Sequence, residues 1–159
     1  MAYDNNNRGG FPGRQYPNQN ARQLPPEVKA LPLPEDYVDE AEAVIRRLAE
    51  REQNDSKAKI ITTSKIRNLL SLISDVYNVE NLRNEAELAP ESVTALTMAR
   101  IRVVYEAGRE SSVKYFVKEA KLLQYLKDIK RDRKKLIDFS HYMEALVAYH
   151  RLYIGGKEG

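Results

Sequence analysis

Cysteine is missing from this chain of 159 residues, and so is any long apolar run. Without cysteine there can be no disulfide framework, no thiolate catalysis and no cysteine-ligated metal, which suits a cytoplasmic protein. A membrane-spanning helix needs about 18 or more apolar residues in succession, so we expect no membrane contact. The first ten residues, MAYDNNNRGG, also lack the apolar stretch of a secretory signal peptide.

Patterns typical of catalysis are missing as well. His141 and His150 are nine residues apart, half a turn out of phase on one helix, so they cannot bind a metal from the same face. The HExxH motif needs histidines four apart, and no glycine-rich phosphate loop occurs. His150 falls on an apolar stripe and is interpreted as a hydrogen-bonded core histidine, while Ser64 and Ser111 suit helix caps. We therefore predict no enzymatic activity, no metal and no cofactor.

Positive charge is in small excess. The net charge is +3, with 31% charged and 42% hydrophobic residues, the balance of a soluble globular chain. Such a charge permits contact with an anionic partner but falls short of a strongly basic DNA-binding tail. The length leaves room for one domain, since a core of about 100 residues can fold alone.

Proline is concentrated at one end, with six of the seven prolines in residues 1–34 among many Asn, Gln and Gly residues. This segment has almost no apolar face, so it cannot offset the entropy lost on ordering. We predict a disordered leader over residues 1–34, a helical domain over 35–155 and a frayed C-terminus over 156–159. Deleting residues 1–33 is expected to leave the thermal midpoint nearly unchanged. A solvated tail is preferred over RNA contact by its arginines and tyrosines, which are Arg8, Arg14, Arg22, Tyr3 and Tyr16.

The remaining sequence has a helical apolar period, and no segment alternates for long as a strand would. We predict an all-α bundle of about five helices, over residues 35–52, 62–77, 91–108, 111–129 and 136–153. The helix over 91–108 is apolar around most of its circumference, which predicts a central position, and Gly108 is expected to end it in the left-handed conformation. The basic run KRDRKK, residues 130–135, is expected to cover a turn or an exposed helix end.

Several cations near two of these helices are candidates for binding an anion. TTSKIRNLL opens a helix with a hydroxyl cap and places Lys65 and Arg67 on its first turn, about 200° apart and so not in one stripe. Arg102 lies opposite the apolar arc of its helix, and Arg109 follows just past that helix. Arg100 falls inside the arc, which predicts an internal ion pair. By residue chemistry alone, ordinary surface charge is favoured over nucleic-acid contact.

Three segments change that balance because together they resemble a known family. TTSKIRNLL, RIRVVYEAGRE and FSHYMEALVAYHRLY occur in the order and approximate spacing of the small helical subunit of the type III-A CRISPR effector, the Csm complex. The resemblance covers residues 60–155, and YEAGR with EALVAY is fairly specific in combination. The first 60 residues carry no pattern of that family.

The resemblance implies a helical bundle without catalytic residues, stacked in several copies along a ribonucleoprotein filament in antiviral defence. Its implied partners are the backbone and large subunits, which do the catalytic work, together with the guide RNA and the target RNA. The family contacts target RNA mainly through basic side chains, which map by motif to Lys65, Arg67 and Arg109; Arg102 is added from its place on the helix. Guide pairing would supply sequence specificity, so phosphate contacts suffice.

Two other classes of function stay open. A helical scaffold that binds only protein needs no basic face, and its complexes would survive nuclease treatment. A free-standing single-strand RNA or DNA binder would bind well alone, but the sequence shows no clear row of exposed aromatic residues for base stacking.

Overall fold

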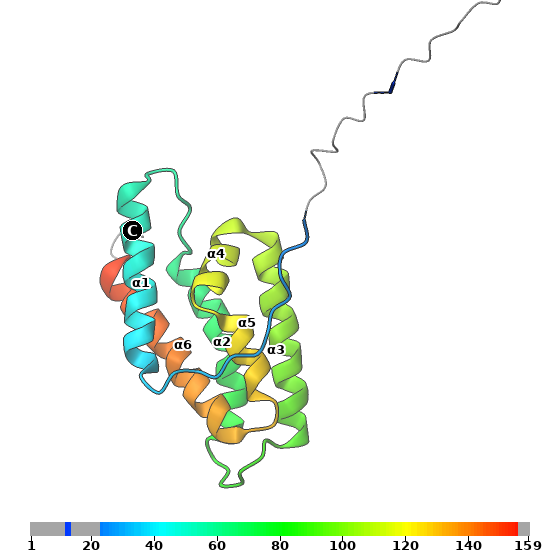
Figure 1. Ribbon diagram of the computed structural model, residues 1–159. Helices are drawn as coiled ribbons and strands as arrows, with labels where there is room; N and C mark the ends of the chain where they lie inside the picture. Colours follow the sequence, from blue (N-terminus) through cyan, green and yellow to red (C-terminus); the bar gives the residue numbers. More distant parts are fainter. Residues whose placement is uncertain (1–11, 14–22, 156–159) are drawn as a thin grey trace, which may run out of the picture.

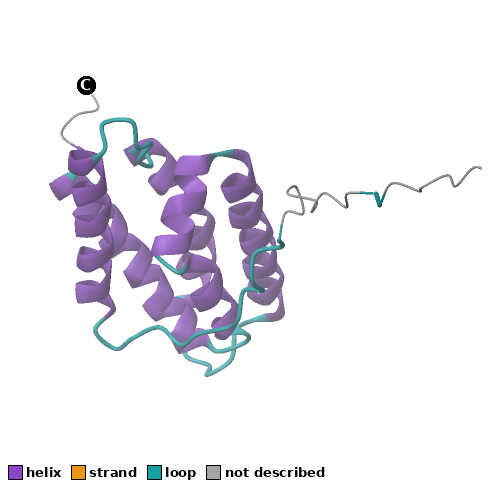
Figure 2. Ribbon diagram, turned by 45° about the horizontal axis from the view of Figure 1, so that its top comes forward, coloured by secondary structure: helices purple, strands orange, loops and turns teal. Residues whose placement is uncertain are grey.

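The computed structural model describes residues 12–13 and 23–155, and within them the chain forms six helices and, apart from an isolated bridge between Glu87 and Asp132, no strand pairing. The helices are α1 (Tyr37–Asn54), α2 (Thr63–Glu80), α3 (Pro90–Arg109), α4 (Ser111–Glu119), α5 (Leu122–Ile129) and α6 (Arg133–Tyr153). They form a single bundle with α1 and α3 on opposite sides (Figure 1; tilted in Figure 2). The all-α prediction is confirmed, with six helices instead of about five. The predicted frayed C-terminus lies outside the described residues.

Short polar caps and a proline determine where several helices begin. The Thr62 hydroxyl accepts a hydrogen bond from the Lys65 backbone N–H at 3.3 Å, so the predicted hydroxyl cap is confirmed. The Asp132 carboxylate accepts one from the Lys135 N–H at 3.2 Å. Each cap satisfies an N–H that has no partner within the helix. Pro90 occupies the first turn of α3, where its missing N–H costs nothing.

The single helix predicted over residues 111–129 is wrong, because the chain divides it into α4 and α5. Lys121 stands at the division with a left-handed backbone, φ 53° and ψ 37°. Val113 in α4 and Leu122 in α5 are both buried, yet nine residues would place them half a turn apart on a continuous helix. The division turns both apolar faces toward the core.

The central helix is α6, which packs against α1, α2 and α5. The expectation that residues 91–108 would be central is wrong. One side of α3 carries four apolar side chains that are each more than half exposed, here called the α3 stripe: Met98, Ile101, Val104 and Tyr105. Gly108 does not end the helix either, since α3 continues to Arg109 and no described glycine has a positive φ.

Residues 23–36, here called the strap, run without helix from beside α3 across α5 to the start of α1 (Figure 1). Leu33 packs against the core. Two hydrogen bonds join the strap to α5, from the Leu31 N–H to the Gln124 carbonyl at 3.1 Å and from the Lys127 ammonium to the Val28 carbonyl at 2.6 Å. The end of the predicted leader therefore contacts the bundle. Most of residues 1–22 lie outside the described part, so disorder there stays a prediction.

Glu80, at the end of α2, connects that helix to α3 and α6. Its buried carboxylate accepts two bonds from the Arg83 guanidinium, at 2.7 and 3.0 Å, and one from the Ala89 N–H at 2.9 Å. Its backbone carbonyl accepts a bond from the Arg133 side chain at 2.8 Å. Because Ala89 precedes α3 and Arg133 begins α6, one residue fixes the meeting of three helices.

His150 is fully buried, with Nε2 2.7 Å from the Ile61 carbonyl oxygen and Nδ1 3.5 Å from the Thr63 hydroxyl. A neutral ring can donate from Nε2 to that carbonyl, so the predicted hydrogen-bonded core histidine is confirmed. His141 instead lies against the rings of Tyr37 and Tyr77. Among the described residues no three His, Asp or Glu side chains gather as metal ligands. None of the described helices is both long and apolar enough to span a membrane.

Candidate nucleic-acid interface

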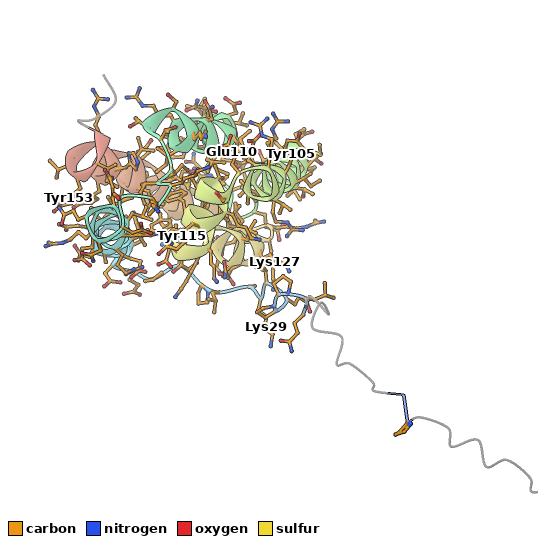
Figure 3. All side chains as sticks on the ribbon, turned by 90° about the horizontal axis from the view of Figure 1, so that it is seen from above. Lys29, Tyr105, Glu110, Tyr115, Lys127 and Tyr153 are labelled. Atoms are coloured by element: carbon orange, nitrogen blue, oxygen red, sulfur yellow. The ribbon has the colours of Figure 1, made fainter. Side chains whose placement is uncertain are left out.

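A cleft of about 540 Å³ opens between the N-terminal half of α2 and the C-terminal half of α3. Three of the four cations selected from the sequence line it, Lys65, Arg102 and Arg109. The two carboxylates in its lining are Glu106 and Glu110, and α2 adds hydroxyl and amide side chains. We call this feature the α2/α3 cleft. Figure 3 shows Glu110 and Tyr105 on this side of the molecule.

Lys65 reaches the cleft because the Thr62 cap fixes the first turn of α2 beneath it. Its ammonium forms an ion pair with the Glu110 carboxylate, which stands at the junction of α3 and α4. The hydrogen bond from Lys65, with the nearby charges of Lys65 and Arg109, lowers the pKa of Glu110 below its usual value. The pair therefore joins α2 to the end of α3 across the cleft.

Arg102 and Arg109 come from one face of α3 and share a carboxylate. Glu106 lies 3.5 Å from the Arg102 Nε and 3.4 Å from an Arg109 Nη, the spacing expected for side chains four and three residues apart on a helix. Arg109 also lies 3.6 Å from Glu110, and the Arg102 guanidinium stands 5.5 Å from the centre of the Tyr105 ring. Both arginine side chains are 58% or more exposed, so they remain accessible to a ligand.

The cleft carries three positive and two negative side chains, so its net charge is weakly positive. Arginine and lysine donors bind phosphate oxygens well, and the nearby Ser64 hydroxyl and Asn68 amide can add hydrogen bonds. The two carboxylates hold the cations in position but also compete for them. Chemically the arrangement suits a reversible grip on an anionic backbone, and its described lining includes no nucleophile paired with a base.

The fourth predicted cation, Arg67, does not line the cleft. It is exposed on another face of α2, as its angular separation from Lys65 predicts. The expected internal ion pair of Arg100 is not present: this half-buried residue pairs with none of the described carboxylates, and it lies on the side of α3 that faces α5.

The two glutamates of the cleft were not selected from the sequence. Glu106 could have been found, because it follows Arg102 by four residues and precedes Arg109 by three. Glu110 could not, because its partner Lys65 is 45 residues away and the two meet only when α2 and α3 pack together.

Comparison with known proteins agrees with the segments that suggested a family. The sequence model of the family described as Csm2 Type III-A matches residues 38–156. The "CRISPR system Cms protein Csm2" of Streptococcus thermophilus is 42% identical over 130 residues, which is 81% of this chain and 99% of that protein. The protein of the same name from Mycobacterium tuberculosis is 36% identical over 126 residues, 79% of this chain and 97% of that protein.

A third relative, the Csm2 of Enterococcus italicus, is 38% identical over 96 residues, 58% of this chain and 68% of that protein. The matched region includes nearly all of the six helices and every residue of the cleft. The family match begins at residue 38, so the expectation that the first 60 residues carry no pattern of the family is wrong for residues 38–60. The resemblance seen in the sequence is confirmed, and this chain belongs to the Csm2 family of type III-A CRISPR systems.

Proposed function

We propose that this chain is the small, non-catalytic subunit of a type III-A CRISPR effector, and that its α2/α3 cleft holds the phosphate backbone of the target RNA paired with the guide. Several copies would stack along the ribonucleoprotein filament beside the backbone and large subunits. Membership of the Csm2 family supports the assembly part of this proposal.

One observation carries the RNA part. Lys65 and Arg109 were selected from separate motifs and Arg102 from its helix position, yet all three line the same cleft. Arg102 and Arg109 share one face of α3 by helix spacing, whereas Lys65 joins them only because α2 packs beside α3. Cations can hold phosphates without contacting base edges, which fits a protein whose sequence specificity comes from guide pairing.

Binding would proceed by exchange of partners. A phosphate that enters the cleft replaces Glu106 and Glu110 at the three cations. Ion pairs that are open to solvent contribute little to stability, so releasing them costs little. The binding free energy gained by exchanging a carboxylate for a phosphate is also small. We therefore expect one isolated subunit to bind RNA weakly and the stacked copies to bind it through many contacts in parallel.

The test measures the affinity of the reconstituted effector for target RNA over a salt series. The variant carries Lys65→Gln, Arg102→Gln and Arg109→Gln. Each phosphate contact to a single strand contributes about −0.7 to the slope of log affinity against log salt, so removing three should flatten the slope by about 2 per subunit. The matched control is Arg47→Gln, Lys134→Gln, Lys135→Gln, which removes three ion-paired cations outside the cleft. An unchanged slope in an intact assembly would reject the cleft as the RNA contact. Arg67→Gln, tested alone, asks whether the separate face of α2 contributes.

A scaffold role is a second candidate, and the α3 stripe favours it. A stripe of four exposed apolar residues suits contact with a protein or with another copy. Replacing Met98 and Ile101 by serine should then release subunits from nuclease-treated complexes while the cleft still binds RNA. Retention of all subunits would argue against this role.

A further inference from the structure

A second basic groove lies between α3 and α5, on the side of α3 away from the cleft. Four cations line a hollow of about 250 Å³, namely Arg100, Lys127, Lys130 and Arg131. Its remaining lining is mostly apolar, with Val93 and Leu96 from α3 and Leu126 from α5. We call it the α3/α5 groove. The KRDRKK run supplies two of its cations, which the α2/α3 cleft does not use.

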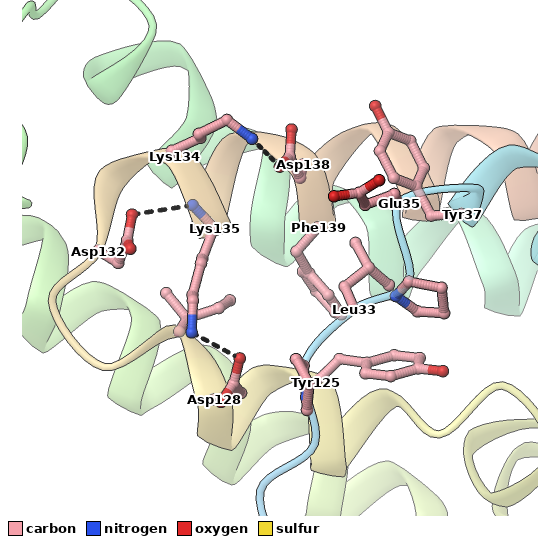
Figure 4. A pocket seen from close by; sticks show the side chains of 13 residues that line it. Leu33, Glu35, Tyr37, Tyr125, Asp128, Asp132, Lys134, Lys135, Asp138 and Phe139 are labelled. Carbon is pink, nitrogen blue, oxygen red and sulfur yellow. Dashed lines mark hydrogen bonds and ion pairs between the residues drawn. The ribbon is translucent and has the colours of Figure 1, made fainter.

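Among the described residues, no acidic side chain lines this groove. None of its four cations forms an ion pair with any carboxylate that the structure describes. The cleft differs, since Glu106 and Glu110 occupy its cations. The hollow in Figure 4 differs too: there Lys134 pairs with Asp138 and Lys135 with Asp128. Uncompensated like charges repel one another, so a bound anion would relieve the repulsion.

The turn that presents two of these cations is firmly held. Arg131 accepts a bond at its carbonyl from the Leu88 N–H at 2.8 Å, and the Asp132 N–H donates to the Ile129 carbonyl at 2.9 Å. Lys130 has a positive φ of 53°, a conformation that a lysine adopts only at a cost. The charges are thus displayed on a fixed turn instead of a mobile loop.

The groove is elongated. A neighbouring hollow of about 490 Å³ shares both Arg100 and Lys127 with it and continues toward Val28 of the strap. Figure 3 shows Lys29 beyond Lys127, on the side of the molecule away from Glu110. The two hollows together form one elongated groove, with its four cations at the end near the 130–131 turn and apolar side chains, among them Ile101 and Val104 of the α3 stripe, toward the strap. An elongated groove fits a nucleotide chain better than one small anion.

We propose that the α3/α5 groove binds the backbone of a single RNA strand, as a site separate from the α2/α3 cleft. Arg100 and Arg102 are two residues apart, so they point about 200° from each other around α3. One nucleotide segment cannot lie on both. The α3 stripe occupies the face between the two sites, and the proposal does not rest on the cleft being an RNA contact.

The experiment measures binding of a fluorescent oligouridine to the full chain by anisotropy over a salt series. The groove variant is Arg100→Gln, Lys130→Gln, Arg131→Gln; Lys127 is kept because it holds the strap through Val28. Removing three phosphate-binding cations, at about 0.7 each, should flatten the salt slope by about 2 and weaken binding most at low salt. Two comparison variants carry the same charge change: Arg47→Gln, Lys134→Gln, Lys135→Gln, and the cleft triple. Circular dichroism confirms that each variant keeps its helices.

The results separate the possible occupants. A flattened slope for the groove variant, with the Arg47, Lys134, Lys135 control unchanged, supports the proposal whatever the cleft variant does. An unchanged slope overturns it. Tripolyphosphate that competes as well as the oligouridine at equal phosphate concentration also overturns it, because the site would then recognise a small anion. If the groove variant keeps its RNA slope but fails to enter the effector, the groove is a protein surface and the proposal is wrong.

Discussion

Glu80 combines full burial with a full negative charge. Burial works to raise the pKa of its carboxyl, but hydrogen bonds from Ser92, the Ala89 N–H and Arg83 together outweigh it, so the pKa is lowered. A buried carboxylate is stable only when its oxygens are bonded in this way. The loop of residues 81–89 therefore folds back on a charge.

We expect Glu80→Gln to lower the free energy of unfolding by about 1–3 kcal/mol at neutral pH, since charged hydrogen bonds are replaced by weaker ones and one lone pair by an N–H. Urea denaturation of Glu80→Gln beside Glu87→Gln, an exposed residue of the same loop, measures this. Equal midpoints for the two variants would contradict the assignment.

Comparing wild type with Glu80→Gln as a function of pH tests the lowered pKa of Glu80. A folded pKa below the free value of 4.5 means that the stabilisation by Glu80 is complete above about pH 4.5 and is lost as the pH falls through the folded pKa. Glutamine does not titrate, so the difference in free energy of unfolding between wild type and Glu80→Gln should become smaller as the pH falls below 4.5. If this difference stays constant down to the pH of acid unfolding, the charge of Glu80 is not the source of the stabilisation.

Side chains were predictable where local spacing determines their partners. His150 could be assigned to the core because it falls on the apolar stripe of its helix, and Arg67 could be separated from Lys65 by angle alone. Arg100 was misjudged, because which neighbour faces a helix is decided by tertiary packing. Nothing in its own helix indicates that α5 would bring it more cations instead of an acid.

The junction of α4 and α5 shows how a helix can be divided without glycine or proline. Lys121 takes the left-handed conformation there, and the Tyr142 hydroxyl of α6 donates to the Ala120 carbonyl at 2.8 Å. The backbone penalty at Lys121 is offset by the burial of two apolar faces, on α4 and on α5.

Lys121→Gly should raise the free energy of unfolding by about 0.5–1 kcal/mol, because glycine removes the left-handed penalty but adds freedom to the unfolded chain. Lys114→Gly, at an exposed position inside α4, is the control and should lower the free energy of unfolding by about 0.5–1 kcal/mol. Chemical denaturation of both variants distinguishes them; destabilisation by both would mean that residue 121 gains nothing from glycine.

Helix positions were largely predictable, because caps and prolines act within a few residues of the chain. The Thr62 cap and Pro90 mark the starts of α2 and α3 in the sequence itself. Which helix lies at the centre of the bundle was not predictable. The apolar circumference of residues 91–108 suggested a buried position, but an apolar side chain can equally serve a surface contact, and the sequence does not distinguish the two.

At the scale of the molecule, the strap crosses one face of the bundle and ends at α1 (Figure 1). The chain begun at residue 23 should keep the thermal midpoint. The chain begun at residue 35 keeps the Asp36 cap of α1 but loses two strap hydrogen bonds and the contact of Leu33 with the core, so its free energy of unfolding should fall by about 1–3 kcal/mol. This differs from the sequence-based expectation that removal up to residue 33 is neutral.

Differential scanning calorimetry of the two truncations provides the measurement. Leu33→Ser and Leu24→Ser in the full chain are matched point variants, since Leu33 packs on the core and Leu24 is 91% exposed. Equal midpoints for both truncations, and for both serine variants, would mean that the strap does not stabilise the bundle.

The position of α6 also determines how this chain can fold during synthesis. α1 packs mainly on α6, yet α1 ends at residue 54 and α6 begins at residue 133. At a translation rate of roughly 5–20 residues per second, the apolar face of α1 waits several seconds for its partner. Val44, Ile45 and Leu48 are exposed to solvent or to a chaperone during that interval. A ribosome that stalls before residue 133 therefore leaves a fragment that cannot close its core, and one that finishes releases a bundle closed by its last helix.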